Sequence, residues 1–238
     1  MSRRTGCMSV LDGVERRPDS HHDRRVELGR RSRVRPPATI AAASASAREP
    51  VPSTLRRGSA ARIAGVIIWI NGPFGAGKTT VTAQLLQTRP DFAMFDTEHV
   101  GFLLGPPLRE RRPVADFQDW VSWRRLVVAT LAELDDELNT DIVVPQTVIV
   151  EQYWSEIASG LAGRGIGLRA FTLDVTLEEH ERRIATDRVE AQAAGWRRQR
   201  RPDFDAALPW LRIQTHVIDT TNKPPGRVAE TIVQTLDL

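Results

Sequence analysis

The chain contains the segment Gly72-Pro73-Phe74-Gly75-Ala76-Gly77-Lys78-Thr79-Thr80, which matches the pattern G-x-x-x-x-G-K-[ST]. An apolar, β-branched run at 66–70 precedes this segment and predicts a buried strand. A run at 81–86 follows it and predicts a helix. A strand, a glycine-rich turn and a helix in this order predict a phosphate cradle, because N–H groups of the turn and of the helix N-terminus point toward one anion.

Each residue of this segment is a candidate ligand of a bound nucleotide. Lys78 is predicted to reach the β- and γ-phosphates of ATP and to act in catalysis. The Thr79 hydroxyl is predicted to hold Mg²⁺. A glycine-rich turn that binds no ligand is the alternative interpretation.

The charge of the chain is unevenly distributed, which suggests two parts. Residues 1–65 carry 14 arginines and no lysine against six acidic residues, and residues 66–238 carry 19 basic against 24 acidic residues. The first part is rich in Arg, Ser, Ala and Pro and has no sustained apolar period, so we expect it to be a disordered arm. In one interpretation the arm is disordered without a function, which includes the case that the start site of the protein is misplaced. In the other, the arm touches nucleic acid or an anionic membrane.

The cysteine content suggests a reducing compartment. Cys7 is the chain's single cysteine, so no intrachain disulfide can form, and a cytoplasmic location is expected. No apolar run is long enough to predict a transmembrane helix, although contact of the arm with a membrane surface stays open. A monomer and a homodimer both remain compatible with the sequence.

Strands and helices alternate along residues 66–238, which form the predicted nucleotide-binding, kinase-like domain. The expected strands lie at about 66–70, 92–95, 142–144, 168–173 and 216–218. The expected helices lie at about 78–88, 116–138, 152–163, 176–188, 203–214 and 226–236. The alternation predicts a three-layer α/β fold of the P-loop NTPase class, with a five-stranded parallel sheet between helices.

The second expected strand is followed by polar residues that could carry chemistry. In parallel sheets, ligands gather at the carboxyl ends of the strands. Asp96 follows this strand, which we expect beside strand 66–70, so Asp96 is predicted to act as a base or to bind Mg²⁺. A solvated residue that caps the next segment is the alternative. Glu98 and His99 are weaker candidates for substrate contact.

The third strand is followed by Pro145, Gln146 and Thr147, with no acidic residue before Glu151. Many P-loop enzymes have a Mg²⁺-associated acid at such a position, so Asp96 or water would have to take that role here. Gln146 and Thr147 are predicted to hydrogen-bond the substrate or a catalytic water.

Several arginines are candidates for stabilising the transferred phosphoryl group, because a planar guanidinium matches phosphate oxygens. Arg183 and Arg188 are predicted to be catalytic, and the polar segment 189–202 is predicted to be a lid over ATP. Four further arginines of this segment are not ranked by the sequence, and a solvated charged face is the alternative for each. They are Arg197, Arg198, Arg200 and Arg201.

Aromatic residues near the strand ends could line an acceptor pocket, although such residues more often form a core. They are Trp120, Trp123, Tyr153 and Trp154. Arg124, which follows two of them on the long helix, is predicted to face the acceptor.

The chain resembles the tunicamycin-resistance proteins, which are small bacterial P-loop ATP-binding proteins. Four segments of the body carry the resemblance, which covers about residues 66–238. They are Ile68-Trp69-Ile70-Asn71-Gly72 with the loop that follows it, Phe95-Asp96-Thr97-Glu98-His99-Val100-Gly101, Asp116-Phe117-Gln118-Asp119-Trp120 and Val143-Val144-Pro145-Gln146-Thr147.

The resemblance implies a fold like that of nucleoside-monophosphate and shikimate kinases, ATP binding and protection against the nucleoside antibiotic tunicamycin. By analogy with those kinases, Asp219, Thr220, Thr221, Asn222 and Pro224 would border the adenine.

Two hypotheses of function follow. In the first, a small-molecule kinase transfers the γ-phosphate of MgATP to a hydroxyl of a nucleoside-like or sugar-like acceptor, with Asp96 as base. In the second, ATP closes the domain around tunicamycin or a related nucleotide-sugar compound, and sequestration protects the cell. A third hypothesis, a nucleic-acid-stimulated ATPase, is supported by the basic arm alone. A signalling GTPase is disfavoured, because no Asn-Lys-x-Asp motif occurs and Asn222-Lys223 is followed by Pro224-Pro225.

Overall fold

The computed structural model of this chain describes residues 65–189 and 191–236. The predicted basic arm, except Gly65, lies outside these described residues. The strands are β1 (Val66–Asn71), β2 (Ala93–Met94), β3 (Ile142–Pro145), β4 (Gly167–Asp174) and β5 (His216–Asp219). The α-helices are α1 (Lys78–Thr88), α2 (Glu98–Leu108), α3 (Val121–Leu138), α4 (Glu151–Ala162), α5 (Leu177–Thr186), α6 (Ala194–Gln214) and α7 (Pro225–Leu236). Two short 3-10 helices, η1 (Phe117–Asp119) and η2 (Ala191–Ala193), precede α3 and α6.

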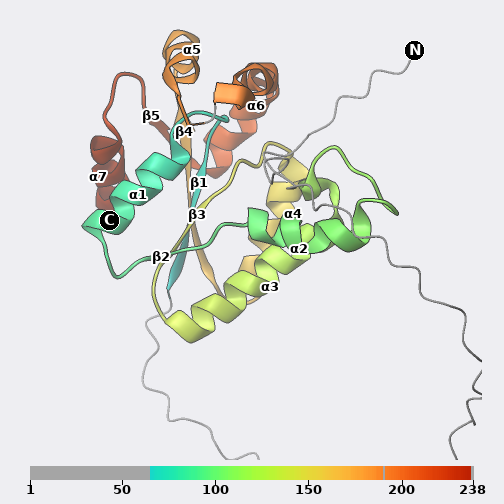
Figure 1. Cartoon of the computed structure of the whole chain (residues 1–238). Helices are drawn as coiled ribbons and strands as arrows, with labels where there is room; N and C mark the ends of the chain where they lie inside the picture. The colour runs from blue at the N-terminus through green and yellow to red at the C-terminus, as the bar shows by residue number, and fades with distance from the viewer. Residues whose placement is uncertain (1–64, 190, 237–238) are drawn as a thin grey trace, which may run out of the picture. The chain divides into compact units, whose positions relative to one another are not determined.

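The strands form one parallel five-stranded sheet in the order β2-β3-β1-β4-β5. Helices α1 and α7 cover one face of the sheet, and α3 and α4 cover the other (Figure 1). The prediction of a three-layer α/β fold with a five-stranded parallel sheet is therefore confirmed. Among the helices that the structure describes, none combines the length and apolar character that crossing a bilayer needs.

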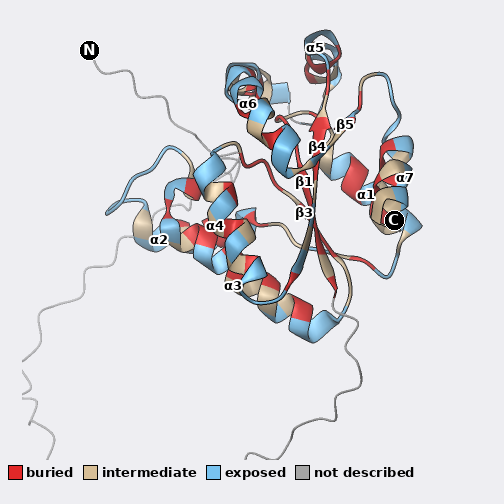
Figure 2. Ribbon diagram, turned by 180° about the vertical axis from the view of Figure 1, so that it is seen from behind, coloured by how far each residue is buried: buried red, intermediate tan, exposed pale blue. Residues whose placement is uncertain are grey.

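Strand β1 is buried on both faces, which explains its continuous apolar sequence. Ile67 and Trp69 pack with α3 and α4, whereas Ile68 and Ile70 pack with α1 and α7. Successive side chains of a strand point to opposite faces, so one strand contributes to two cores. Figure 2 shows buried residues running along the centre of the sheet, from which the loops at the carboxyl ends of the strands emerge.

The structure corrects the expected position of Asp96. We expected its strand beside the first strand, but β3 lies between β2 and β1. The residues after β3 are therefore closer in the sheet to the glycine-rich turn than Asp96 is. Strand order depends on contacts between distant segments, and the local sequence of β2 does not encode it.

Two segments outside the expected helices are helical. The segment with Gly105-Pro106-Pro107 belongs to α2, whose last turn contains both prolines. The basic segment 194–202 is the first part of α6, which continues to Gln214 through Pro202 and Pro209. The expected long helix, by contrast, is shorter than predicted. It begins at Val121 rather than at 116, because Asp116 caps the separate 3-10 turn η1.

Candidate functional site

The glycine-rich loop between β1 and α1 has the backbone conformation that its glycines permit. Gly75 and Gly77 have φ of 90° and 93°, in the left-handed region that favours glycine. A side chain at Gly72 would place its Cβ 2.9 Å from the carbonyl oxygen of Leu173 on β4. The loop also holds Lys78 in place, because its Nζ donates hydrogen bonds to the carbonyls of Gly72 (3.1 Å) and Pro73 (3.2 Å).

Backbone donors gather at the end of this loop without protein acceptors. Within the described part of the chain, no hydrogen bond uses the N–H groups of Gly75, Gly77, Lys78, Thr79 or Thr80. Four such donors are expected at any helix N-terminus, and here the turn adds one more. This arrangement can bind a polyanion such as the phosphates of a nucleotide.

A cavity of about 870 Å³ adjoins these donors. Its walls come from the glycine-rich loop, from α5, from the first turn of α6 and from the segment between β5 and α7. The residues of the nucleotide prediction that line it are Gly75, Ala76, Gly77, Lys78, Thr79, Thr80, Thr220 and Asn222. Gly72, Pro73 and Phe74 form the part of the loop next to β1, and Asp219 caps the turn that follows β5 by accepting from the Thr221 N–H at 2.9 Å.

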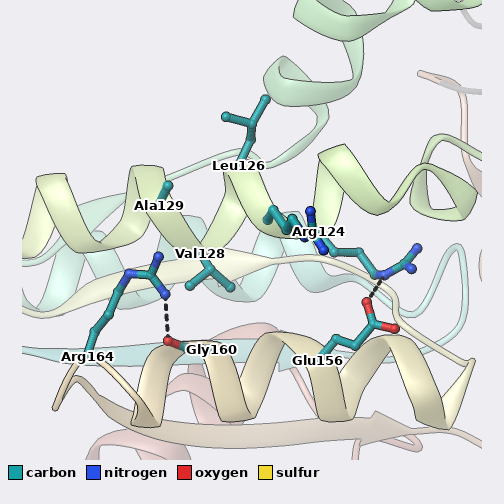
Figure 3. Close-up of a pocket in the computed structure, with 8 residues that line it drawn as sticks. Arg124, Leu126, Val128, Ala129, Glu156, Gly160 and Arg164 are labelled. Carbon is teal, nitrogen blue, oxygen red and sulfur yellow. Dashed lines mark hydrogen bonds and ion pairs between the residues drawn. The ribbon is translucent and has the colours of Figure 1, made fainter.

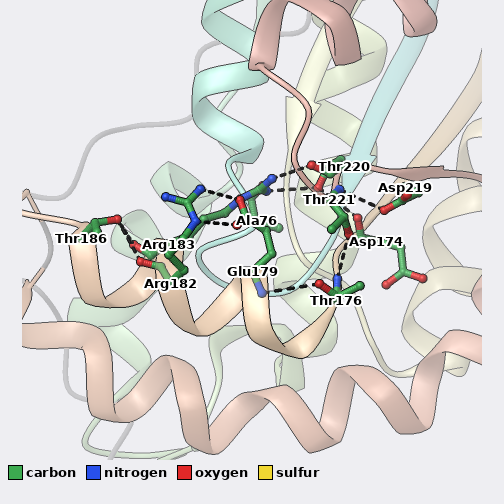
Figure 4. Close-up of polar contacts among 10 residues, drawn as sticks. All are labelled: Ala76, Asp174, Thr176, Glu179, Arg182, Arg183, Thr186, Asp219, Thr220 and Thr221. Atoms are coloured by element: carbon green, nitrogen blue, oxygen red, sulfur yellow. Dashed lines mark hydrogen bonds and ion pairs between the residues drawn. The ribbon is translucent and has the colours of Figure 1, made fainter.

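Arg183 connects the two sides of the cavity (Figure 4). Its guanidinium donates to the carbonyl of Ala76 (3.0 Å), to the Thr220 carbonyl (2.6 Å) and to the Thr220 hydroxyl (3.1 Å). Glu179 accepts from Arg183 (2.8 Å) and from Arg182 (2.6 and 2.7 Å), and hydrogen bonds from Arg182 and then Arg183 lower the pKa of Glu179 to about 2. Arg183 thus holds the loop to the β5–α7 segment and also lines the cavity, and the catalytic role expected of it stays a prediction.

Glu179 also takes part in the N-terminal cap of α5. Thr176 and Glu179 have the spacing of a capping box, and the Thr176 hydroxyl accepts from the Glu179 N–H at 3.4 Å. The Glu179 carboxylate instead pairs with the two arginines of the next turn. Spacing alone therefore predicted the cap but missed the ion-pair cluster behind the phosphate loop.

Lys78 has an unusual electrostatic setting. Burial, and then the nearby positive charge of Arg197, lower the pKa of Lys78 to about 7, while the carboxylate of Glu98 opposes this shift. A bound phosphate group would supply the missing negative charge beside this amine. The site is therefore prepared electrostatically for an anion.

The first turns of α6 lie over the loop as the predicted lid segment would. The ring of Trp196 packs against that of Phe74, with centroids 4.4 Å apart. Arg197 lines the cavity and forms an ion pair with Asp187 at 2.6 Å. The structure thus distinguishes Arg197 from the other arginines that the sequence could not rank.

The remaining arginines of this region contact groups outside the cavity. Arg198 pairs with Glu181, and Arg200 pairs with Asp203. Arg201 is buried and donates to the carbonyl of Val175 at 3.0 Å. Arg188 was predicted to be catalytic, but its side chain is exposed and does not line the cavity.

Three carboxylates that do not line the cavity lie near one another, and one of them, Glu98, interacts electrostatically with Lys78. We name this group the acceptor end: Asp96, Glu98 and Asp116. Asp96 accepts from the Glu98 N–H at 2.9 Å and so caps the start of α2. Loss of solvation and the nearby Asp96 carboxylate raise the pKa of Glu98. His99 is exposed beside Phe102, with ring centroids 6.2 Å apart.

A buried hydrogen-bond network connects the acceptor end to the phosphate loop. Gln146 accepts from the Thr97 hydroxyl at 2.9 Å, and the Thr147 hydroxyl donates to the Gly72 carbonyl at 2.8 Å. Gln118 donates to the Thr147 carbonyl at 2.9 Å. Gln146 and Thr147 were predicted to contact substrate, whereas in the structure their side chains are buried and hold neighbouring segments together. The position of Gln118 in the sequence does not identify it as part of this network, because it does not follow a strand.

Arg124 lies away from the nucleotide cavity. It lines a separate cavity of about 440 Å³ between α3 and α4, where it pairs with Glu156 at 2.6 Å (Figure 3). It also donates to the carbonyl of Gln118 and stacks its guanidinium 4.0 Å from the ring centroid of Tyr153. The Tyr153 hydroxyl donates to Asp119 at 3.0 Å, and Trp120, Trp123 and Trp154 are core residues.

The residues at the loop fit a Mg²⁺ ion bound together with a nucleotide. The described residues contain no group of three or more His, Cys, Asp or Glu side chains that could hold a metal by themselves. Mg²⁺ at nucleotide sites commonly takes few protein ligands and completes its shell with phosphate oxygens and water. The exposed Thr79 hydroxyl, in the first turn of α1 at the cavity wall, could serve in such a site.

Comparisons with known proteins identify a family and a similar structure. Residues 67–202 match a family described as AAA domain. The tunicamycin resistance protein of Deinococcus radiodurans is similar in structure, with a TM-score of 0.58 and 28% identity over 73% of this chain and 96% of that chain. The predicted resemblance is therefore confirmed. No curated protein sequence matches this chain significantly.

Two kinases share the fold at lower sequence identity. Shikimate kinase from Acinetobacter baumannii has a TM-score of 0.51 and 19% identity, over 72% of this chain and 93% of that chain. A gluconokinase from Sinorhizobium meliloti has a TM-score of 0.50 and 16% identity, over 74% of this chain and 94% of that chain. At these identities the similarity concerns the fold alone.

Proposed function

We propose that this chain, which belongs to the AAA domain family, binds MgATP. It transfers the γ-phosphate to a hydroxyl of a nucleoside-like or sugar-like acceptor. We further propose that tunicamycin is such a compound and that the protein confers resistance to it. The cytoplasmic location, based on Cys7, stays a prediction. One observation supports the proposal most: backbone N–H groups without an acceptor among the described residues line one cavity with Lys78, Thr220 and Asn222.

The nucleotide is proposed to bind along this cavity. Its phosphates would accept from the N–H groups of the loop and from Lys78, and Arg197 would add charge from the α6 side. The residues Thr220, Asn222 and Pro224 would border the base at the other end. When bound, Mg²⁺ would neutralise charge on the phosphate oxygens, held on the protein side by the Thr79 hydroxyl.

The acceptor is proposed to bind at the acceptor end. One oxygen of Asp96 caps α2, which leaves the other to orient the acceptor hydroxyl and take its proton. Glu98 is the second candidate for this role, because its carboxylate interacts with Lys78 and its pKa is raised. A raised pKa suits a base that works near neutral pH.

Mass spectrometry tests the proposed transfer. Tunicamycin is incubated with the full chain and MgATP, and the drug is then analysed. A gain of one phosphate group supports the kinase, and unmodified drug that remains bound to the protein supports ATP-dependent sequestration. Sequestration is favoured by the absence of an acidic residue directly after β3. Recovery of unmodified and unbound drug contradicts both functions.

Three variants identify the base. Asp96→Asn is expected to bind ATP normally and to lose transfer, and Glu98→Gln is the competing variant. Glu110→Gln serves as the matched control, because Glu110 is an exposed carboxylate beyond the end of α2. Full transfer by Asp96→Asn together with loss by Glu98→Gln would assign the role to Glu98.

A further inference from the structure

We propose that His180 is a positioning residue of the phosphate loop, because its ring fixes the Phe74–Gly75 peptide so that the Gly75 N–H faces the phosphates. His180 is on α5, outside the loop motif, and none of the roles above includes it. The inference rests on the proposed nucleotide binding and adds a residue that prepares the same site for it.

The contact between His180 and the loop determines the ring's tautomer. The His180 side chain is fully buried, and its Nε2 lies 2.8 Å from the carbonyl oxygen of Phe74. A carbonyl only accepts hydrogen bonds, so Nε2 must carry the proton. The other nitrogen, Nδ1, is buried and has no hydrogen-bond partner among the described residues.

The geometry of the peptide bond transmits this contact to the cavity. In a planar trans peptide, the C=O and N–H groups point in opposite directions. When the Phe74 carbonyl points at His180, the Gly75 N–H points away from α5. Gly75 lines the nucleotide cavity, and its N–H has no acceptor within the described residues. His180 therefore turns one donor of the loop toward the position that phosphates would occupy.

Packing around the same peptide leaves little room for rotation. A Cβ at Gly75 would lie 3.3 Å from Ile184, 3.5 Å from Arg197 and 3.6 Å from the His180 Nε2. The Phe74 ring is held by Trp196 on the other side. The peptide is thus confined between α5 and α6, and its hydrogen bond to His180 selects the orientation.

The charges around His180 keep the ring neutral. Burial lowers the pKa of His180, and Arg201 on α6 and Arg183 on α5 lower it further. The hydrogen bond with Phe74 and the Glu181 carboxylate on α5 oppose this shift. The lowered pKa favours the neutral ring, which donates to Phe74 when its proton is on Nε2.

Two variants of His180 separate the hydrogen bond from the packing. His180→Phe keeps a ring of similar size without a donor, and His180→Gln offers an amide donor in its place. Thr82→Val is the matched control, because the Thr82 side chain in α1 is equally buried and its hydroxyl has no partner among the described residues. Calorimetry measures the binding of ATP, inorganic triphosphate and adenosine to each full-length variant.

His180→Phe is expected to weaken the binding of ATP and of inorganic triphosphate by the same factor, about tenfold to a hundredfold, since one donor to a charged ligand is misdirected. Adenosine binding should change less than about threefold, a small effect on this scale. His180→Gln should recover most of the loss, and Thr82→Val should bind like the natural chain. A merely structural role would weaken all three ligands together.

The outcomes distinguish this inference from the proposed function. If the natural chain binds neither ATP nor triphosphate, the proposed function fails. If the natural chain binds both and His180→Phe binds them equally well, the positioning role is wrong. Should His180→Phe not fold, nitrogen-15 NMR of the natural chain still decides, because a ring that carries its proton on Nδ1 and none on Nε2 would contradict the hydrogen bond to Phe74.

Discussion

The two ends of the candidate site differ in how they are built. The nucleotide end is organised by one continuous segment, residues 72–80, whose backbone supplies the donors. The acceptor end combines side chains from separate segments, namely Asp96 and Glu98 after β2 and Asp116 before η1, and Asp96 and Asp116 accept hydrogen bonds from neighbouring backbone groups. A site made of consecutive backbone groups depends on local conformation, whereas a site made of scattered side chains depends on the complete fold.

The largest expected effect belongs to Lys78. Replacement by alanine removes a charge-assisted contact to two phosphates, and we expect ATP affinity to fall about a hundredfold. Lys223→Ala is the matched control, because the chain's other lysine donates to the Asp219 carbonyl at 2.7 Å and lies in the β5–α7 segment. Equilibrium dialysis with labelled ATP measures both variants, and equal losses would contradict the assignment.

The second largest effect is expected for Arg183, which connects the phosphate loop to the β5–α7 segment. Arg183→Leu breaks the contacts to Ala76 and Thr220, so ATP affinity should fall about tenfold. Arg182→Leu is the control, because Arg182 pairs with the same Glu179 carboxylate without reaching the loop. If Arg182→Leu weakens ATP binding as much as Arg183→Leu, the ion pairs with Glu179 determine the affinity, and the contacts of Arg183 with Ala76 and Thr220 do not.

These two predictions concern the part of the site that the sequence predicts well. The loop motif and the alternation of strands and helices follow from local patterns, and the loop, the cavity and the residues at 220 and 222 do come together. Sheet order was missed, because β3 inserts between β2 and β1 through contacts between distant segments. The partners of Arg124 and Arg183 and the exposure of Arg188 could not be predicted from the sequence, since a long side chain reaches whichever partner the packing brings near it.

The pH dependence of ATP binding gives a smaller effect. The pKa of Lys78 is about 7 in the free protein, and bound phosphates should raise it. Above pH 7, Lys78 then loses its proton in the free protein but keeps it in the complex with ATP. ATP affinity is therefore full below pH 7 and should fall several-fold by about pH 8. Titrations across this range measure the profile, and Lys78→Ala should lose this component. An identical profile in that variant would refute the role given to Lys78.

The smallest effect probes the connection between the two ends. Thr147→Val removes the hydroxyl that donates to the Gly72 carbonyl and should lower the free energy of unfolding by about 1 kcal/mol. Denaturant unfolding measures this change. We expect ATP affinity to change less than about twofold, since no phosphate donor is lost. A larger loss of affinity would mean that the acceptor end also shapes the phosphate loop.

The central claim is that the loop at 72–80 holds the phosphates of MgATP. Calorimetric titration of the full chain with ATP in magnesium buffer tests this claim most directly. We expect saturable heat from a single site per chain, with an affinity that falls strongly in Lys78→Ala. The absence of any binding heat with ATP, in protein that unfolds cooperatively, would contradict it.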